Sequence, residues 1–115
     1  MPDCLSRKSL LGTIIWVNLE PVSPPAPGKT RPAIVISNSD QNTVLQSVIV
    51  IPLSSQAPEI WPLRLRLDFP TGKPSFAVLP GMRPVSKARI QEVAGVARAG
   101  DMDRIDEAVL VYLSD

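Results

Sequence analysis

The stretch that decides the fold is KTRPAIVISN, residues 29–38, together with IVIPLSSQ, residues 49–56. Each piece is a run of β-branched and other apolar residues with polar residues at one end, which predicts buried strands at 32–37 and 44–53. Turn-forming side chains at 38–42 separate them, so the two strands should pair as neighbours. An arginine and paired hydroxyl groups would then lie at one sheet edge, where they could face the same phosphate.

The rest of the chain predicts four more strands and one helix. A β-branched and aromatic run predicts a strand at 12–19, and strict alternation predicts another at 63–69, with Phe69 on the core face. Shorter runs predict strands at 75–79 and 90–96. After Gly100, apolar residues from Met102 to Tyr112 recur at helical spacing. We therefore expect a mainly β protein: a barrel or twisted, meander-like antiparallel sheet of about five to six strands, with one C-terminal helix.

The length and composition limit the classes of function. The 115 residues suit a single domain, 1–115, whose first ten residues we expect to form a flexible tail. The only cysteine, Cys4, excludes a disulfide framework, and the absence of histidine excludes imidazole catalysis and histidine-ligated metals. No apolar run approaches the roughly 20 residues of a membrane span. We expect a cytoplasmic protein that uses no membrane, metal or cofactor.

The small net charge of +1 conceals an uneven distribution. Residues 29–98 hold nine basic and four acidic residues, whereas residues 99–115 hold one basic and five acidic residues. A basic centre is compatible with binding a polyanion such as RNA, but scattered lysine and arginine residues more often form a solvated surface. Composition alone favours the solvated surface.

Several ordered motifs resemble one known family. They are GTIIWV at 12–17, the RPAIV signature at 31–35, IPLSS at 51–55, RPVSKARI at 83–90 and the closing IDEA at 105–108. From residue 12 to about 113 the chain resembles the MazF/PemK/Kid toxins, which share an SH3-like barrel with CcdB. The resemblance is specific for the fold, while the activity must be argued from the site.

The resemblance implies the toxin of a type II toxin–antitoxin system. Such a toxin is a homodimer that cleaves single-stranded RNA at specific sequences without a metal, as an endoribonuclease of the mRNA-interferase type. The antitoxin's acidic, disordered C-terminal tail would cover the RNA site. Arg31 matches the family's catalytic arginine, and Ser54 stands where the family usually carries threonine. The residues expected to contact RNA are Lys29, Thr30, Ser55, Gln56, Arg83, Lys87 and Arg89.

Two departures from the family concern acid–base chemistry. The chain has Pro80-Gly81 where several relatives carry Asp-Gln, and its proline-rich loop 21–32, which includes Ala26, lacks the acids and amides often found there. Glu20 is a conceivable base, although marking the end of the first strand is its simpler role. Loss of an acid–base step lowers a rate by about 10²–10⁴-fold.

Alternative functions therefore stay open. One is a non-catalytic, CcdB-like module that binds DNA gyrase, although the chain lacks the C-terminal tryptophan tail of such proteins; another is a decayed toxin that only binds antitoxin. Single residues also have structural alternatives. Ser54 and Ser55 could cap backbone groups, Lys87 and Arg89 could be solvated, and Trp16 and Trp61 could either stack on unpaired bases or pack within the protein.

Overall fold

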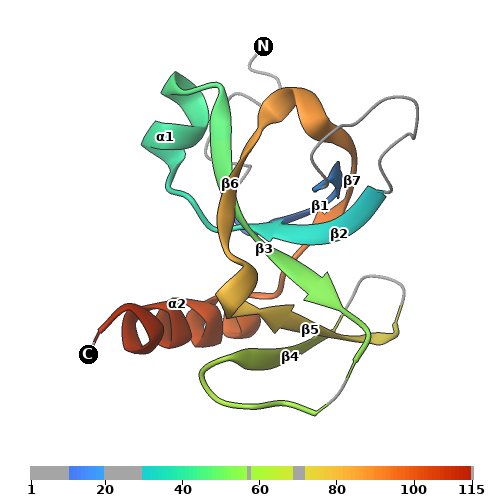
Figure 1. Ribbon diagram of the computed structural model, residues 1–115, viewed down its shortest axis with the longest axis vertical. Coiled ribbons are helices and arrows are strands. Elements are labelled where there is room, and N and C mark those ends of the chain that lie inside the picture. Colours follow the sequence, from blue (N-terminus) through green and yellow to red (C-terminus); the bar gives the residue numbers. More distant parts are fainter. Residues whose placement is uncertain (1–10, 20–29, 57, 69–71, 115) are drawn as a thin grey trace.

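The computed structural model describes residues 11–19, 30–56, 58–68 and 72–114 (Figure 1). The expected tail 1–10, Glu20, Ala26, Lys29 and Phe69 lie outside these ranges. The described part contains seven strands, two α-helices and two short 3-10 helices. Their bounds are β1 Thr13–Asn18, β2 Thr30–Val35, α1 Ser39–Val44, β3 Ser47–Ser54, β4 Arg64–Asp68, β5 Pro74–Val78, η2 Leu79–Gly81, β6 Arg83–Ser86, η3 Lys87–Arg89, β7 Ile90–Val96 and α2 Ala99–Leu113.

The strands form one antiparallel sheet in the order β4-β5-β3-β2-β1-β7, with β6 pairing on β3. The sheet does not close, because β4 and β7 lie at its two ends. A mainly β fold with a C-terminal helix is therefore confirmed, with seven strands where five to six were predicted. The meander-like pairing of consecutive strands is confirmed for β1, β2 and β3 and for β4 with β5, whereas β3 also pairs with β5 and β6, and β7 returns to β1.

Strand β3 has two neighbours beyond β2. Its residues 47–50 pair with β6, and Leu53 and Ser54 pair with β5. Pro52 lies between these two pairings and has no backbone N–H with which to continue a ladder. The chain passes from β5 to β6 through η2, where a Cβ built on Gly81 would lie 2.7 Å from Cγ of Pro52. Glycine at position 81 thus allows η2 to lie directly against β3.

The segment between β2 and β3 is a helix, which the sequence analysis did not predict. α1 occupies residues predicted as a turn and as the start of a strand, and Asn38 caps it by accepting a hydrogen bond from the Gln41 N–H at 2.9 Å. Two buried side chains fix this helix: Ser37 Oγ donates to Asn42 Oδ1 at 2.5 Å, and Asn42 Nδ2 donates to the Ser37 carbonyl at 2.8 Å. Strand β3 consequently begins at Ser47 rather than at residue 44.

Alternate residues of the central strands enter two separate hydrophobic clusters. In β1, Ile14 belongs to one cluster, whereas Ile15 and Val17 belong to the other. In β2, Ile34 belongs to the cluster that contains Ile14, whereas its neighbours Ala33 and Val35 belong to the other cluster. This period-two pattern means that the curved sheet buries both faces of its central strands.

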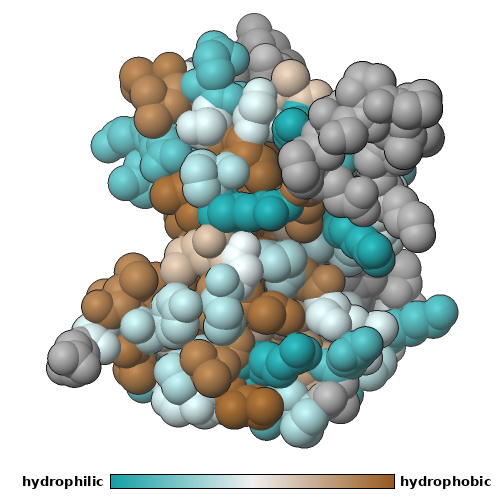
Figure 2. Space-filling model, in the orientation of Figure 1, coloured by the Kyte–Doolittle hydropathy of each residue, from teal (hydrophilic) through white to brown (hydrophobic). Residues whose placement is uncertain are grey.

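Helix α2 covers the cluster that contains Ile14. Ile105 and Ala108 are fully buried there, and Met102, Val109 and Tyr112 pack around them, so the predicted helical stripe is confirmed. Hydrophobic side chains nevertheless remain at the surface over α2 (Figure 2), where Leu110, Val111 and Leu113 are exposed. In the part of the chain that the structure describes, no helix combines the length and the hydropathy needed to traverse a bilayer.

A polar clasp covers the outer edge of β4. Glu59, from the β3–β4 connection, accepts a hydrogen bond from the Arg66 N–H at 3.0 Å and forms an ion pair with Arg104 of α2. Arg104 Nη1 donates to the Arg66 carbonyl at 2.9 Å. The outward backbone groups of Arg66 are therefore satisfied by two side chains that also bind each other. The clasp joins the edge strand, the connection and the helix.

Candidate functional site

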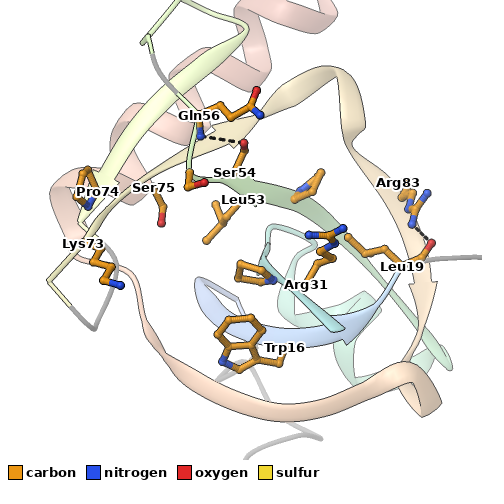
Figure 3. Close-up of a pocket in the computed structure, with 13 residues that line it drawn as sticks. Trp16, Leu19, Arg31, Leu53, Ser54, Gln56, Lys73, Pro74, Ser75 and Arg83 are labelled. Atoms are coloured by element: carbon orange, nitrogen blue, oxygen red, sulfur yellow. Dashed lines mark hydrogen bonds between the residues drawn. The ribbon is translucent and has the colours of Figure 1, made fainter. Parts of the chain in front are cut away.

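A cavity of about 890 Å³ opens where the start of β2 and the end of β3 meet the starts of β5 and β6 (Figure 3). In the view of Figure 3, Arg31 lies near its centre, Trp16 below it, Ser54 and Gln56 above it, Lys73 and Ser75 to the left and Arg83 to the right. The described residues that line it are Trp16, Leu19, Arg31, Pro32, Pro52, Leu53, Ser54, Ser55, Gln56, Lys73, Pro74, Ser75 and Arg83.

Arg31 and Ser54 belong to neighbouring strands and share this cavity. The pairing of β2 with β3 runs from Val35 opposite Val50 to Ala33 opposite Pro52. Arg31 precedes this paired stretch on β2 and Ser54 follows it on β3, and both residues line the cavity. The structure thus brings the Arg31 guanidinium and the Ser54 hydroxyl group to the lining of one cavity.

The Ser54 hydroxyl also has a structural role. Its Oγ accepts a hydrogen bond from the Gln56 N–H at 3.1 Å, which tightens the turn that follows β3. Gln56 is held from the other side, because Arg64 Nη1 donates to its carbonyl oxygen at 3.2 Å. A serine hydroxyl can donate one hydrogen bond while it accepts others. The capping role therefore leaves the Ser54 proton able to donate to a ligand in the cavity.

The charge of the cavity is positive. Arg31, Lys73 and Arg83 line it, and none of its described lining residues is a carboxylate. Among the described residues, the ion pairs involve Arg98 and Arg104, both away from the cavity, and not Arg31. Coulomb attraction and the planar fork of arginine therefore favour an anion with several oxygen atoms, such as a phosphate.

The other predicted RNA contacts are divided among several places. Ser55, Gln56 and Arg83 line the cavity with Arg31 and Ser54. Thr30 is exposed at the start of β2, opposite Asn18, and does not line it. Arg89 lines a smaller adjoining hollow. Lys29 lies outside the described residues.

Lys87 lies apart from the cavity that holds Arg31. Its half-buried side chain donates from Nζ to the Asn42 carbonyl oxygen at the end of α1. This contact ties η3 to α1 because a lysine stem can reach a carbonyl that the short helix leaves without an intrahelical partner. The structural alternative considered for Lys87 was a solvated side chain. Lys87 instead contacts a carbonyl oxygen of the protein.

Several lining residues were not assigned to the site from the sequence. Lys73 and Ser75 enter it because β5 pairs with β3 and places Phe76 opposite Ser54. That pairing joins distant segments, so local periodicity holds no signal for it. Trp16 packs on the core, the structural alternative considered for it, and also lines the cavity. Trp61, by contrast, is 47% exposed and does not line the cavity.

Comparison with known proteins identifies the family of the chain. Residues 11–113 match the family described as "PemK-like, MazF-like toxin of type II toxin-antitoxin system". The chain belongs to this family of toxins.

Solved structures of MazF proteins have a similar fold. MazF from Deinococcus radiodurans (Form-I) superposes with a TM-score of 0.72 at 23% identity, covering 90% of this chain and 94% of that one. The MazE-MazF complex (Form-II) of the same organism gives 0.73 at 22% identity, with coverages of 97% and 100%. An endoribonuclease from a mycobacterial species gives 0.72 at 16% identity, with coverages of 89% and 88%. Sequence identities this low show a common fold only, so the chemistry must be argued from the residues of the site.

Proposed function

We propose that this PemK/MazF-family protein is the toxin component of a type II toxin–antitoxin system and acts as a metal-independent, sequence-specific endoribonuclease on single-stranded RNA. The observation that carries the proposal is the pair Arg31 and Ser54, which share one cationic cavity at the start of β2 and the end of β3. Membership of the family supports the toxin role. The mycobacterial protein of the same fold, named as an endoribonuclease, supports the reaction class.

The reaction is an internal transesterification. A ribose 2′-oxygen forms a bond to the adjacent phosphorus, the bond from phosphorus to the 5′-oxygen breaks, and the products end in a 2′,3′-cyclic phosphate and a 5′-hydroxyl. Negative charge grows on the two non-bridging oxygens in the transition state. Arg31 acts there as a bidentate clamp with a permanent positive charge, and Ser54 donates a hydrogen bond to one of these oxygens.

Proton transfer limits the rate of cleavage in this proposal. The 2′-hydroxyl must lose a proton and the leaving 5′-oxygen must gain one. The described lining of the cavity offers no carboxylate for the first step, and Glu20, the conceivable base, lies outside the described residues. We propose that water accepts the first proton and supplies the second. We expect turnover to be slower by about 10²–10⁴-fold than with a positioned acid–base pair.

The proposal includes partners and a location. The cationic cavity suits both RNA and the acidic, disordered tail of a cognate antitoxin, so one site serves the substrate and the inhibitor. Complexes of MazE with MazF among the similar structures support an antitoxin partner. The exposed apolar residues of α2 support a homodimer, and we place the protein in the cytoplasm.

The first experiment tests cleavage itself. The purified protein is incubated with a long single-stranded RNA in EDTA, the new ends are mapped, and Arg31→Ala is tested beside it. Arg98→Ala is the matched control, because Arg98 is exposed, pairs with Asp68 and lies outside the cavity. We expect sequence-specific cuts with 2′,3′-cyclic phosphate ends, lost in Arg31→Ala only. Absence of cleavage above the Arg31→Ala level would favour the gyrase-binding or antitoxin-binding alternatives, which the missing carboxylate keeps open.

A further inference from the structure

Lys73 enters the lining of the cavity just before the start of β5. It follows Gly72, whose φ of +87° turns the chain, and it precedes Pro74, the first residue of β5. A proline restricts the residue before it to extended conformations, so the sequence fixes the backbone of Lys73 where the strand begins. Because β5 pairs with the last two residues of β3, this end of β5 is held beside the end of β3. Lys73 therefore lines the same cavity as Arg31.

The ammonium group of Lys73 is accessible to a ligand in this cavity. Its side chain is exposed, and none of the ion pairs among the described residues includes it. In Figure 3, Lys73 lies across the cavity from Arg83, with Arg31 between them. The flexible four-carbon stem of a lysine lets its ammonium approach a phosphate that is bound at Arg31.

The described lining of the cavity contains a single side chain of the kinds that enzymes use as general acids. These kinds are histidine, carboxylic acids, lysine, tyrosine and cysteine, and among the described lining residues only Lys73 belongs to them. Arg31 and Arg83 supply positive charge, but a guanidinium does not release a proton in proteins. We propose that Lys73 is the general acid of the cleavage reaction and protonates the leaving 5′-oxygen of the RNA.

This inference rests on the proposed function, and it adds a path for one proton. As the bond from phosphorus to the 5′-oxygen breaks, its electron pair stays on that oxygen, which takes a proton from Lys73 Nζ. The neutral amine regains a proton from water, while the proton of the 2′-hydroxyl group passes to water, so the protons balance. Water is the source of the second proton, and Lys73 is the group that transfers it. An ammonium has no acceptor, so Lys73 acts on the leaving oxygen and not as the base.

The test uses a leaving group that needs no proton. Single-turnover cleavage is measured on two RNAs with the same cleavage site, one natural and one with sulfur in place of the 5′-oxygen at the cleaved bond. A thiolate leaves without being protonated, so the second RNA does not need a general acid. We expect Lys73→Ala to cleave the natural RNA about 10²–10⁴-fold more slowly than the wild type, and the sulfur-substituted RNA at a rate near that of the wild type. Arg31→Ala should be slow on both RNAs.

Lys73→Arg separates proton transfer from charge. Arginine keeps the positive charge but does not release a proton, so this variant should also be slow on the natural RNA and restored on the sulfur-substituted RNA. Arg98→Ala is the matched control, because Arg98 is exposed and lies outside the cavity, and it should cleave both RNAs at the wild-type rate. Urea denaturation of each variant shows whether it is folded.

The outcomes separate this inference from the proposed function. If Lys73→Ala is equally slow on both RNAs, or if Lys73→Arg cleaves the natural RNA at the wild-type rate, Lys73 supplies only charge; the inference then fails and the proposed function stands. A wild-type rate for Lys73→Ala on the natural RNA would overturn the inference in the same way. If the wild type cleaves neither RNA, both fail.

Discussion

Gly81 lies directly against the ring of Pro52: a Cβ added to Gly81 would lie 2.7 Å from Pro52 Cγ, closer than real Cβ atoms approach such a neighbour. Pro52 lines the cavity and Gly81 is the last residue of η2, so this contact places η2 behind the part of the cavity wall that Pro52 forms. For the Pro80-Gly81 pair the resemblance described above implies Asp-Gln in several relatives. In this chain a side chain as large as glutamine at position 81 has no space while Pro52 is present.

Gly81→Ala therefore tests this contact. We expect the variant to lose about 1–3 kcal/mol of unfolding free energy, because overpacking forces the proline ring or the backbone to move. Gly100→Ala is the matched control: Gly100 lies in the first turn of α2 with no atom within 4 Å of an added Cβ, so alanine there should stabilise by up to about 1 kcal/mol. Urea denaturation measures both. Equal effects of the two substitutions would contradict the close contact.

Arg31→Lys separates charge from geometry. Lysine keeps the positive charge in the cavity but loses the planar fork that binds two phosphate oxygens. We expect RNA binding and its salt dependence to stay near the wild-type values, while the single-turnover cleavage rate falls by about 10²-fold or more. A cleavage rate equal to that of the wild type would show that the cavity needs only a point charge.

Ser54→Ala and Ser54→Thr form a matched pair. Alanine removes the hydroxyl that accepts the Gln56 N–H and that we assign to transition-state stabilisation, whereas threonine keeps it. Loss of one such donor lowers rates by about 10²–10³-fold, so we expect that loss in Ser54→Ala and near-normal cleavage in Ser54→Thr. If both variants cleave at the wild-type rate, Ser54 is only a turn residue.

Trp16 and Trp61 offer a comparison for base stacking. Trp16 lines the cavity, while Trp61 is exposed away from it. Stacking of one base on an aromatic ring contributes about 1–3 kcal/mol, so Trp16→Ala should weaken RNA binding by about 5- to 150-fold. Trp61→Ala should leave binding unchanged. Because Trp16 also packs on the core, Trp16→Phe is measured too and should restore part of the affinity in a stably folded protein. Equal losses from both tryptophans would argue against stacking in the cavity.

The Glu59–Arg104 clasp makes a small contribution to stability that depends on pH. The hydrogen bond from the Arg66 N–H, followed by the contacts with Arg104, holds the pKa of Glu59 below its ordinary value of 4.5. A lowered pKa in the folded state means that the stabilisation is present above pH 4.5 and is lost as the pH falls through the folded pKa. Because both side chains are well exposed, we expect less than about 1 kcal/mol.

Glu59→Gln tests the predicted direction of this pH dependence of stability. The variant should unfold at a lower urea concentration than the wild type at pH 7, and the difference should vanish near pH 3. Glu107→Gln, an exposed substitution on α2, should show no such dependence. A difference that persists at low pH would show that the glutamine disturbs the β3–β4 connection by another route.

The sequence predicts the site best where a signal is local. Arg31 lies at the start of β2 and Ser54 at the end of β3, so the antiparallel pairing of these two consecutive strands brings both residues to one cavity. The stripe on α2 is equally local, because Ile105 and Ala108 recur at helical spacing. These features depend on periodicity within one or two neighbouring elements.

Features that depend on distant pairing could not be predicted in this way. The contact of β5 with the end of β3, which brings Lys73 to the cavity, joins segments separated by a connection and another strand. α1 has six residues, too few for a period to appear, and Asn38 gives only the cap signal that turns also use. Val44, predicted to begin a strand, is instead 73% exposed at the end of this helix.

The polar clasp over Arg66 has a consequence for the behaviour of the protein in a crowded solution. An outer strand offers its unpaired amide and carbonyl groups as a template on which other chains can assemble. At the midpoint of β4 both groups are already occupied by Glu59 and Arg104, two charged side chains that an incoming peptide would have to displace. This border of the sheet is therefore protected against intermolecular β-aggregation.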